Sequence, residues 1–542
     1  MTFKPVLLSL AALLAAAPVN AQTIDANRLN ESVRILASDE FEGRGPATPG
    51  EEKTVQWLSE QFAAMGLEPG GDDRSWIQTV RLSRTRQDGP AVITARAGDW
   101  TRTLERGPEV LVSSDRPVSH VTVADAPIVF VGYGADAGEQ GWDDFKDVDL
   151  TGKIMMVLVN DPDFEAAEGD DAFGRFGGRA MTFYGRWTYK FAEAARQGAA
   201  GVLVVHETAG AGYPWSTLEN SALAPKLDIV RADPNAERAP FQGWIQRDRA
   251  AELLSRAGLD YDTLKQAAKQ ANFRPVELTG VTLSVDFGQT ADQVVSRNVL
   301  ARITGTERPD ETVIYSAHWD AYGIGKPAPD GDAIYNGAVD NATGVAAVVE
   351  LAHAFAEGPK PKRSVVFAAW TAEEAGLLGA TWYAAHPIYP LETTVANINV
   401  DSFLPGPTEP EIVVIGYGRN DLDALLAARA EPLGRRLIAD PKPEAGGFYR
   451  SDHFPLALRG VPTLFPAAGF TGASAASRDY VATRYHQPSD EWTPDWTMEG
   501  AAQDIGLIYE VGRELADGTA WPNWKAGDEF RAARDASAEA RQ

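Results

Sequence analysis

Two adjacent glutamates, Glu373 and Glu374, are the residues of this 542-residue chain that most clearly suggest chemistry. They follow the apolar run 365–370 (VVFAAW) and precede the small residues of 375–379 (AGLLG). This order is typical of a buried strand that enters a loop and then a helix. Two carboxylates at such a junction repel each other and are costly to desolvate unless cations lie nearby. Acidic residues are also favoured at a helix N-terminus, so the pair alone leaves both interpretations open.

Other polar residues stand at comparable positions. His318, the glutamate pair and Asp401 each follow a predicted strand, and these strands are expected over 312–317, 364–370 and 395–400. In an open α/β sheet, ligands bind beyond the carboxyl ends of the strands, because side chains distant in the sequence meet there. We therefore expect these residues to lie in one crevice.

The residue types suit a pair of metal ions. Two ions about 3.5–4 Å apart need a bridging carboxylate and further nitrogen or oxygen ligands on each side. Imidazole with carboxylate suits zinc, cobalt or manganese, and zinc is favoured among these. With Asp340 and His486 added, the chain supplies two histidines, two aspartates and one glutamate, and one glutamate stays free. A free carboxylate beside a metal-activated water is what a hydrolase needs as a general base.

The order His-x-Asp, Asp-Asn-x-x-Gly, Glu-Glu, Asp and Tyr-His resembles the M28 family of dizinc exopeptidases, which includes aminopeptidases and glutamate carboxypeptidase-like enzymes. Each motif is short, but five of them in this order are specific. Residues 35–70 and 296–516 are similar to the peptidase domain. Strands and helices alternate from about 296 onward, which predicts an α/β fold with a mostly parallel twisted sheet flanked by helices. The resemblance implies that this is the zinc exopeptidase fold.

The resemblance also implies two zinc ions per chain and a ligand role for five residues. Asp340 would bridge both ions. His318 and Asp401 would complete one site. Glu374 and His486 would complete the other.

Further roles are implied by the same resemblance. Glu373 would be the general base. Asp320 would hydrogen-bond the outer nitrogen of His318 and fix its tautomer. Tyr485 would donate a hydrogen bond to the oxyanion of the tetrahedral intermediate. The stretch 451–453 (SDH) resembles a pocket-lining motif, and we expect a supporting or substrate-contact role for its aspartate and histidine.

A second module is predicted inside the peptidase domain. It is expected to be β-rich, and it resembles a protease-associated (PA) domain, notably at 147–153 (DVDLTGK) and 184–187 (YGRW). The polar composition after 520 predicts a loosely held tail. The expected division is signal peptide 1–21, peptidase domain 22–119 and 286–520, inserted PA domain 120–285, and polar tail 521–542.

Composition and the N-terminus limit the partners and the compartment. The formal net charge of −26 argues against nucleic acid or an anionic membrane as a partner. Lys4, the apolar run 6–17 and the small-x-small pattern 19–21 (VNA) are typical of a secretory signal that is removed after Ala21. We therefore expect a periplasmic or secreted protein. The chain has no cysteine, so it would fold without disulfides and would hold any metal by histidine and carboxylate.

Several functions stay open at this point. The leading hypothesis is an exported zinc aminopeptidase that acts on peptides. A carboxypeptidase or dipeptidase on the same scaffold would need a cationic pocket for the substrate carboxylate, and Arg450 and Arg484 flank the site motifs. An inactive binding module or a one-metal relative is disfavoured by the complete ligand set and by Glu373. The sequence leaves the oligomeric state open.

Overall fold

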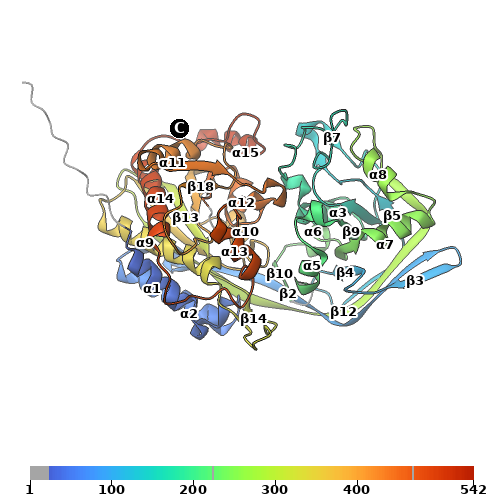
Figure 1. Cartoon of the computed structure of the whole chain (residues 1–542), viewed down its shortest axis with the longest axis horizontal. Coiled ribbons are helices and arrows are strands. Elements are labelled where there is room, and N and C mark those ends of the chain that lie inside the picture. The colour runs from blue at the N-terminus through green and yellow to red at the C-terminus, as the bar shows by residue number, and fades with distance from the viewer. Residues whose placement is uncertain (1–23, 222–224, 467–468, 542) are drawn as a thin grey trace, which may run out of the picture.

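The computed structural model describes residues 24–541 except 222–224 and 467–468. The expected signal peptide, 1–21, lies outside the described residues. Figure 1 shows two lobes joined by the long strands β2 (Ile77–Ala97) and β12 (Val276–Ile303). Within the described residues, no helix combines the length and the apolar character needed to span a bilayer.

One fourteen-stranded sheet runs through both lobes in the described part of the chain. In the lobe that contains both ends of the described chain, β13 (Arg308–His318) lies between β16 (Arg363–Trp370) and β17 (Thr394–Asn399) and is parallel to both. The short β20 (Thr463–Leu464) continues the parallel arrangement beside β17. β12 runs antiparallel to β16 and carries the sheet toward the second lobe. The carboxyl ends of β13, β16 and β17 therefore share one edge.

Helices cover both faces of this part of the sheet. One face is covered by α1 (Ala26–Leu36), α2 (Pro49–Ala64), α9 (Thr343–Glu357) and α14 (Glu499–Asp517). The other is covered by α10 (Leu378–Ala385) and α12 (His453–Ala457). The expected α/β sheet flanked by helices is confirmed.

The buried stretch 313–317 of β13 (VIYSA) shows why this part of the strand is mainly apolar. Val313, Tyr315 and Ala317 belong to the core on the α9 side, whereas Ile314 belongs to the core on the α10 side. Alternate residues of a strand point to opposite faces, so a strand that is buried on both faces must be apolar throughout. This is the pattern from which the strand was predicted.

The second lobe has its own layers and its own cores. The strands β5 (His120–Phe130), β8 (Ile154–Leu158), β9 (Gly201–His206) and β11 (Gln242–Gln246) are parallel neighbours. β4 (Val110–Ser113) adds an antiparallel edge. Helices such as α3 (Trp187–Arg196) and α7 (Arg247–Arg256) pack beside them, so this lobe is less purely β than expected.

The C-terminal segment packs on the first lobe. Trp524 and Phe530 are buried. Arg534, in α15 (Arg531–Ala536), is also buried and donates hydrogen bonds to the carbonyl oxygens of Thr394 at 2.8 Å and Val395 at 3.3 Å. The composition of 521–542 suggested a loose tail, but three large side chains hold this segment against the domain.

The packing of α14 on β13 leads to a stability prediction. A Cβ added at Gly512 would meet the Tyr315 hydroxyl at 1.6 Å, and this hydroxyl donates a hydrogen bond to the Ile508 carbonyl at 3.0 Å. Gly512→Ala should therefore lower the free energy of unfolding by about 1–3 kcal/mol, as overpacking does. The measurement is the midpoint of thermal unfolding by calorimetry.

Gly506→Ala is a matched control on the same helix, because a Cβ added at Gly506 meets no atom within 4 Å. Alanine is preferred over glycine in helices by about 0.5–1 kcal/mol, so this variant should be as stable as the parent or slightly more stable. Equal midpoints for the two variants would contradict the close contact between α14 and β13.

Candidate metal centre

The sequence-predicted site residues meet at one edge of the sheet. His318 is the last residue of β13, Glu373 and Glu374 follow β16, and Asp401 follows β17. Asp340 lies in the segment that leads into α9. The crevice expected at the carboxyl ends of the strands is therefore present.

Two groups of possible metal ligands share Asp340. The Nε2 atom of His318 lies 3.3 Å from Asp340 Oδ1 and 3.5 Å from Asp401 Oδ1. On the other side, the Nε2 atom of His486 lies 3.2 Å from Asp340 Oδ2 and 3.5 Å from Glu374 Oε2. Each carboxylate oxygen of Asp340 thus faces a different histidine.

These separations suit the coordination of zinc. Around a tetrahedral ion with zinc–nitrogen bonds of about 2.0–2.1 Å, neighbouring ligand atoms lie about 3.3 Å apart. Imidazole nitrogens and carboxylate oxygens without sulfur are ligands that zinc accepts. The side chains present therefore fit a zinc ligand set on either side of Asp340.

The buried carboxylates of the site are stabilised by nearby positive charge. Burial raises the pKa of Glu374 to about 7 and raises the pKa of Glu373 well above its ordinary value. Burial also acts to raise the pKa of Asp340, but hydrogen bonds from His318 and His486 outweigh it and lower that pKa. Buried carboxylates this close together are stable only with protons or cations beside them. A divalent ion would supply that charge.

Asp320 supports the site through contacts other than the one expected. The Nδ1 atom of His318 lies 3.1 Å from the main-chain oxygen of Asp320 and 3.8 Å from its carboxylate. The carboxylate instead accepts the backbone N–H groups of Glu373 at 3.0 Å and Glu374 at 3.3 Å. Because a carbonyl oxygen can only accept, Nδ1 carries the proton and Nε2 keeps its lone pair for a metal. The group that holds this tautomer is therefore the main-chain oxygen of Asp320 and not its carboxylate.

Glu373 stands apart from both ligand groups. It is buried, and its carboxylate is close enough to His318 and Asp401 for their charges to affect its pKa. A carboxylate that lies beside the ligands without joining them is free to exchange a proton.

Tyr485 lies against the second histidine. Its ring stacks on that of His486 with centroids 3.7 Å apart, and its hydroxyl accepts a hydrogen bond from Arg450 Nη2 at 3.3 Å. Burial raises the pKa of Tyr485 well above its ordinary value, although Arg450 opposes this shift. The phenol therefore keeps its proton at neutral pH and can donate it in a hydrogen bond.

The stretch 451–453 divides into different structural roles. Ser451 Oγ donates to Asp401 Oδ2 at 2.9 Å and so orients a possible ligand. Asp452 is buried, and neither of its carboxylate oxygens has a hydrogen-bond partner in the described part of the chain. His453 is buried between Phe448 and Phe465, and burial lowers its pKa to about 3. It is a neutral residue of the core, so of the two expected roles its surroundings favour the supporting one.

Asp490 supports the site in a way that sequence reasoning missed. Its carboxylate accepts the backbone N–H groups of Val339 at 3.1 Å and Asp340 at 3.0 Å, and the Tyr480 hydroxyl at 3.1 Å. It fixes the main chain of the shared carboxylate. Its position four residues after His486 was the available signal, because both residues then lie on one short loop.

Arg44 is a second supporting residue that the sequence did not reveal. It is fully buried, and its guanidinium donates to four main-chain oxygens. These belong to Leu36, Trp319, Asn336 and Gly337. Arg44 therefore ties together the segments that carry Asp320 and Asp340. Backbone acceptors leave no side-chain pattern, so no sequence signal could have identified this role.

Known proteins resemble this chain in both sequence and fold. Over 440 residues it is 26% identical to "Aminopeptidase NAALADL1" of Mus musculus. This alignment covers 70% of this chain and 53% of that protein. Over 115 residues it is 39% identical to "Probable glutamate carboxypeptidase" of Arthroderma benhamiae. This alignment covers 20% of this chain and 14% of that protein. The chain therefore spans about half the length of the mouse relative.

The aminopeptidase from Aneurinibacillus sp. strain AM-1 has a similar structure, with a TM-score of 0.53 at 18% identity. The alignment covers 92% of this chain and 95% of that one, so the two share a fold. Residues 298–508 match peptidase family M28. This segment contains every member of both ligand groups, so the candidate metal centre lies entirely within the part of the chain that matches peptidase family M28.

Proposed function

We propose that this chain is an exported metallo-exopeptidase that uses two zinc ions to remove N-terminal residues from peptides. The observation that carries the proposal is the two-sided position of Asp340. One oxygen lies 3.3 Å from His318 and the other 3.2 Å from His486. A single ion needs no shared carboxylate, whereas two-metal hydrolases hold their ions close together across one.

The proposed ligand assignment follows the two groups. Asp340 would be shared by the two ions, His318 and Asp401 would complete one site, and Glu374 and His486 would complete the other. When bound, the ions would lower the pKa of a shared water and polarise the scissile carbonyl.

The other residues move and hold protons. Glu373 accepts a proton from the attacking water and passes it to the leaving amine nitrogen, since its carboxylate is beside the ligands but outside both groups. The protonated phenol of Tyr485 donates a hydrogen bond to the oxyanion. Asp320 holds the two glutamates in place through their backbone amides.

Export and domain division are parts of the same proposal. The N-terminal pattern that ends at Ala21 supports a periplasmic or secreted protein. The separate cores of the second lobe support an inserted domain, which we propose to be a PA domain over 120–285. One of these cores also includes Ile93, Leu104 and Val110, which lie before residue 120. The net charge of −26 supports peptides, rather than nucleic acid or anionic membranes, as partners.

A second candidate function is a carboxypeptidase or dipeptidase. Arg450 contacts the Tyr485 hydroxyl. Arg186 lies near it, because burial and then the positive charge of Arg450 lower the pKa of Arg186 to about 10. The buried Nε atom of Arg186 has no hydrogen-bond partner in the described part of the chain. Guanidinium groups near the site could bind a substrate carboxylate. Arg484, the other arginine considered from the sequence, lies over the ring of Tyr480 instead.

Blocked substrates distinguish the two candidates. We expect the zinc-loaded protein to hydrolyse peptides with a free amine and an amidated carboxyl end, and to leave amine-acetylated peptides intact. A chelator should abolish turnover, and added zinc should restore it. Hydrolysis of the acetylated peptides with a free carboxylate, but not of the amidated ones, would show a carboxypeptidase and contradict the first candidate.

Removing only the proposed base should separate metal binding from turnover. Glu373→Gln should lower kcat by about 10²–10⁴-fold, because general-base catalysis contributes that much. Zinc content, measured by mass spectrometry of the metal, should stay equal to that of the parent. Glu510→Gln changes an exposed glutamate of α14 in the same way and should leave both quantities unchanged. Full activity in Glu373→Gln would exclude this residue as the base.

A further inference from the structure

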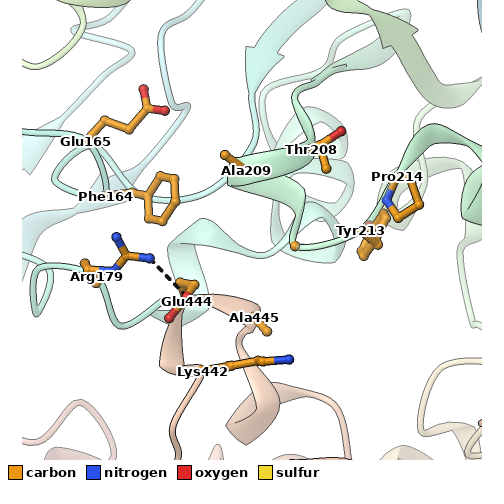
Figure 2. A pocket seen from close by; sticks show the side chains of 11 residues that line it. Phe164, Glu165, Arg179, Thr208, Ala209, Tyr213, Pro214, Lys442, Glu444 and Ala445 are labelled. Carbon is orange, nitrogen blue, oxygen red and sulfur yellow. Dashed lines mark hydrogen bonds and ion pairs between the residues drawn. The ribbon is translucent and has the colours of Figure 1, made fainter. Parts of the chain in front are cut away.

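A cavity of about 600 Å³ lies between the inserted module and the peptidase lobe (Figure 2). The module contributes residues between 164 and 214, and the peptidase lobe contributes residues 442–445. The side chains that matter for its chemistry are Phe164, Glu165, Arg179, Tyr213, Lys442 and Glu444. The cavity thus combines two aromatic rings with charged groups of both signs.

Three of the four charged groups are already paired. Arg179 Nη2 lies 3.0 Å from Glu444 Oε1, and the Arg179 guanidinium also lies over the Phe164 ring. Glu165 forms an ion pair with Lys265 at 2.6 Å. Figure 2 shows the side chain of Lys442 extending away from the Arg179–Glu444 pair.

The ammonium group of Lys442 forms no ion pair or hydrogen bond within the part of the chain that the structure describes. It is therefore a positive charge without an ion-pair partner at the wall of the cavity, and Asp440 is the acidic residue whose pKa it affects. The protein as a whole carries a net charge of −26, so an anionic ligand is repelled over most of the surface. A carboxylate beside aromatic rings is the ligand that this local charge favours.

The cavity borders the loop that reaches the metal ligands. The part of this loop that lines the cavity, 442–445, is bound to the module by a hydrogen bond from Met181 N to the Pro443 oxygen at 3.1 Å. The same loop continues to Arg450, which contacts Tyr485, and to Ser451, which contacts Asp401.

Tyr213 connects the cavity with this loop from the module side. It lines the cavity, and its phenol is close enough to Arg450 to contribute to the raised pKa of that arginine. Arg450 is therefore close both to Tyr485, which lies beside the candidate metal centre, and to Tyr213, which lines the cavity. A peptide that leaves the centre past Arg450 would meet the cavity next.

We propose that this cavity is an exosite for the distal, carboxylate-bearing part of peptides longer than dipeptides. Lys442 pairs with the carboxylate, while Phe164 and Tyr213 contact the apolar part of the peptide. The carboxylate is either the C-terminus or an acidic side chain. This inference rests on the proposed peptidase function, which supplies the peptide.

The test uses the zinc-loaded full chain and its Lys442→Met and Lys442→Glu variants. Substrates are alanine peptides of two to six residues with a free or an amidated C-terminus, and a third series is amidated with glutamate as the last residue. Lys360→Met, at an exposed lysine without an ion pair in the described residues, is the control. The measured quantities are kcat and KM.

Lys442→Met should raise KM about three- to fivefold for the longer peptides that carry a carboxylate, as expected for an exposed ion pair. Lys442→Glu should raise KM further. Dipeptides and neutral amidated peptides should show no change, and kcat should stay constant throughout. If KM rises only for peptides with a free C-terminus, Lys442 binds the C-terminal carboxylate. If KM rises for the amidated peptides that end in glutamate, Lys442 binds an acidic side chain. The exosite would be overturned if the ratio of the variant's KM to the parent's KM were the same for charged and neutral peptides, or if KM changed for neither.

A binding measurement separates failure of this inference from failure of the proposed function. If the parent protein hydrolyses none of the peptides, the peptidase proposal fails, and calorimetry with acetylated hexapeptides then tests the cavity alone. Tighter binding of the free acid than of the amide, lost in Lys442→Glu, would support the exosite. Equal binding of acid and amide would overturn it.

Discussion

The carboxylate of Asp340, held between two imidazoles, is the interaction on which the rest of the site depends. Its two oxygens face His318 and His486, so the residue joins two ligand groups that come from distant parts of the chain. Asp490 accepts a hydrogen bond from the backbone N–H of Asp340, and Arg44 donates one to the main-chain oxygen of the nearby Gly337. Buried acids in such number are costly, and the site is therefore stable chiefly when positive charge is present.

The fold positions this carboxylate by bringing three strand ends to one edge. Parallel neighbours end at the same side of a sheet, so β13, β16 and β17 deliver His318, the glutamate pair and Asp401 without long loops. Asn341 ties the segment that carries Asp340 to the end of β17, because its side chain donates to the Val400 oxygen at 3.2 Å and accepts from Ser402 N at 3.1 Å. The second lobe meets the same edge through the loop that carries Arg450 and Ser451.

Regular patterns and residue types were enough to predict much of this arrangement. The strands expected over 312–317 and 364–370 lie within β13 and β16, because each has an apolar run that is buried on both faces of the sheet. The candidate ligands were found because metals restrict residue type and because strand ends restrict position. The bounds of the domains and the roles of the individual site residues stay predictions.

The rest of the site depends on contacts with the backbone, which leave no pattern in the sequence. Arg44 binds four carbonyl oxygens, and the carboxylate of Asp320 binds two amides rather than the imidazole of His318. The C-terminal segment was misjudged for a related reason. Its average polarity hid Trp524 and Phe530, and burial of two aromatic rings is enough to hold a short segment.

The most direct test of the central claim is anomalous X-ray scattering at the zinc edge from crystals of the zinc-loaded protein. The account predicts two peaks, one beside each oxygen of Asp340. One peak should be contacted by His318 and Asp401, and the other by His486 and Glu374, with Glu373 bound to neither. A single peak would contradict a two-zinc centre that shares Asp340. A peak that is coordinated by Glu373 would contradict its role as the free base.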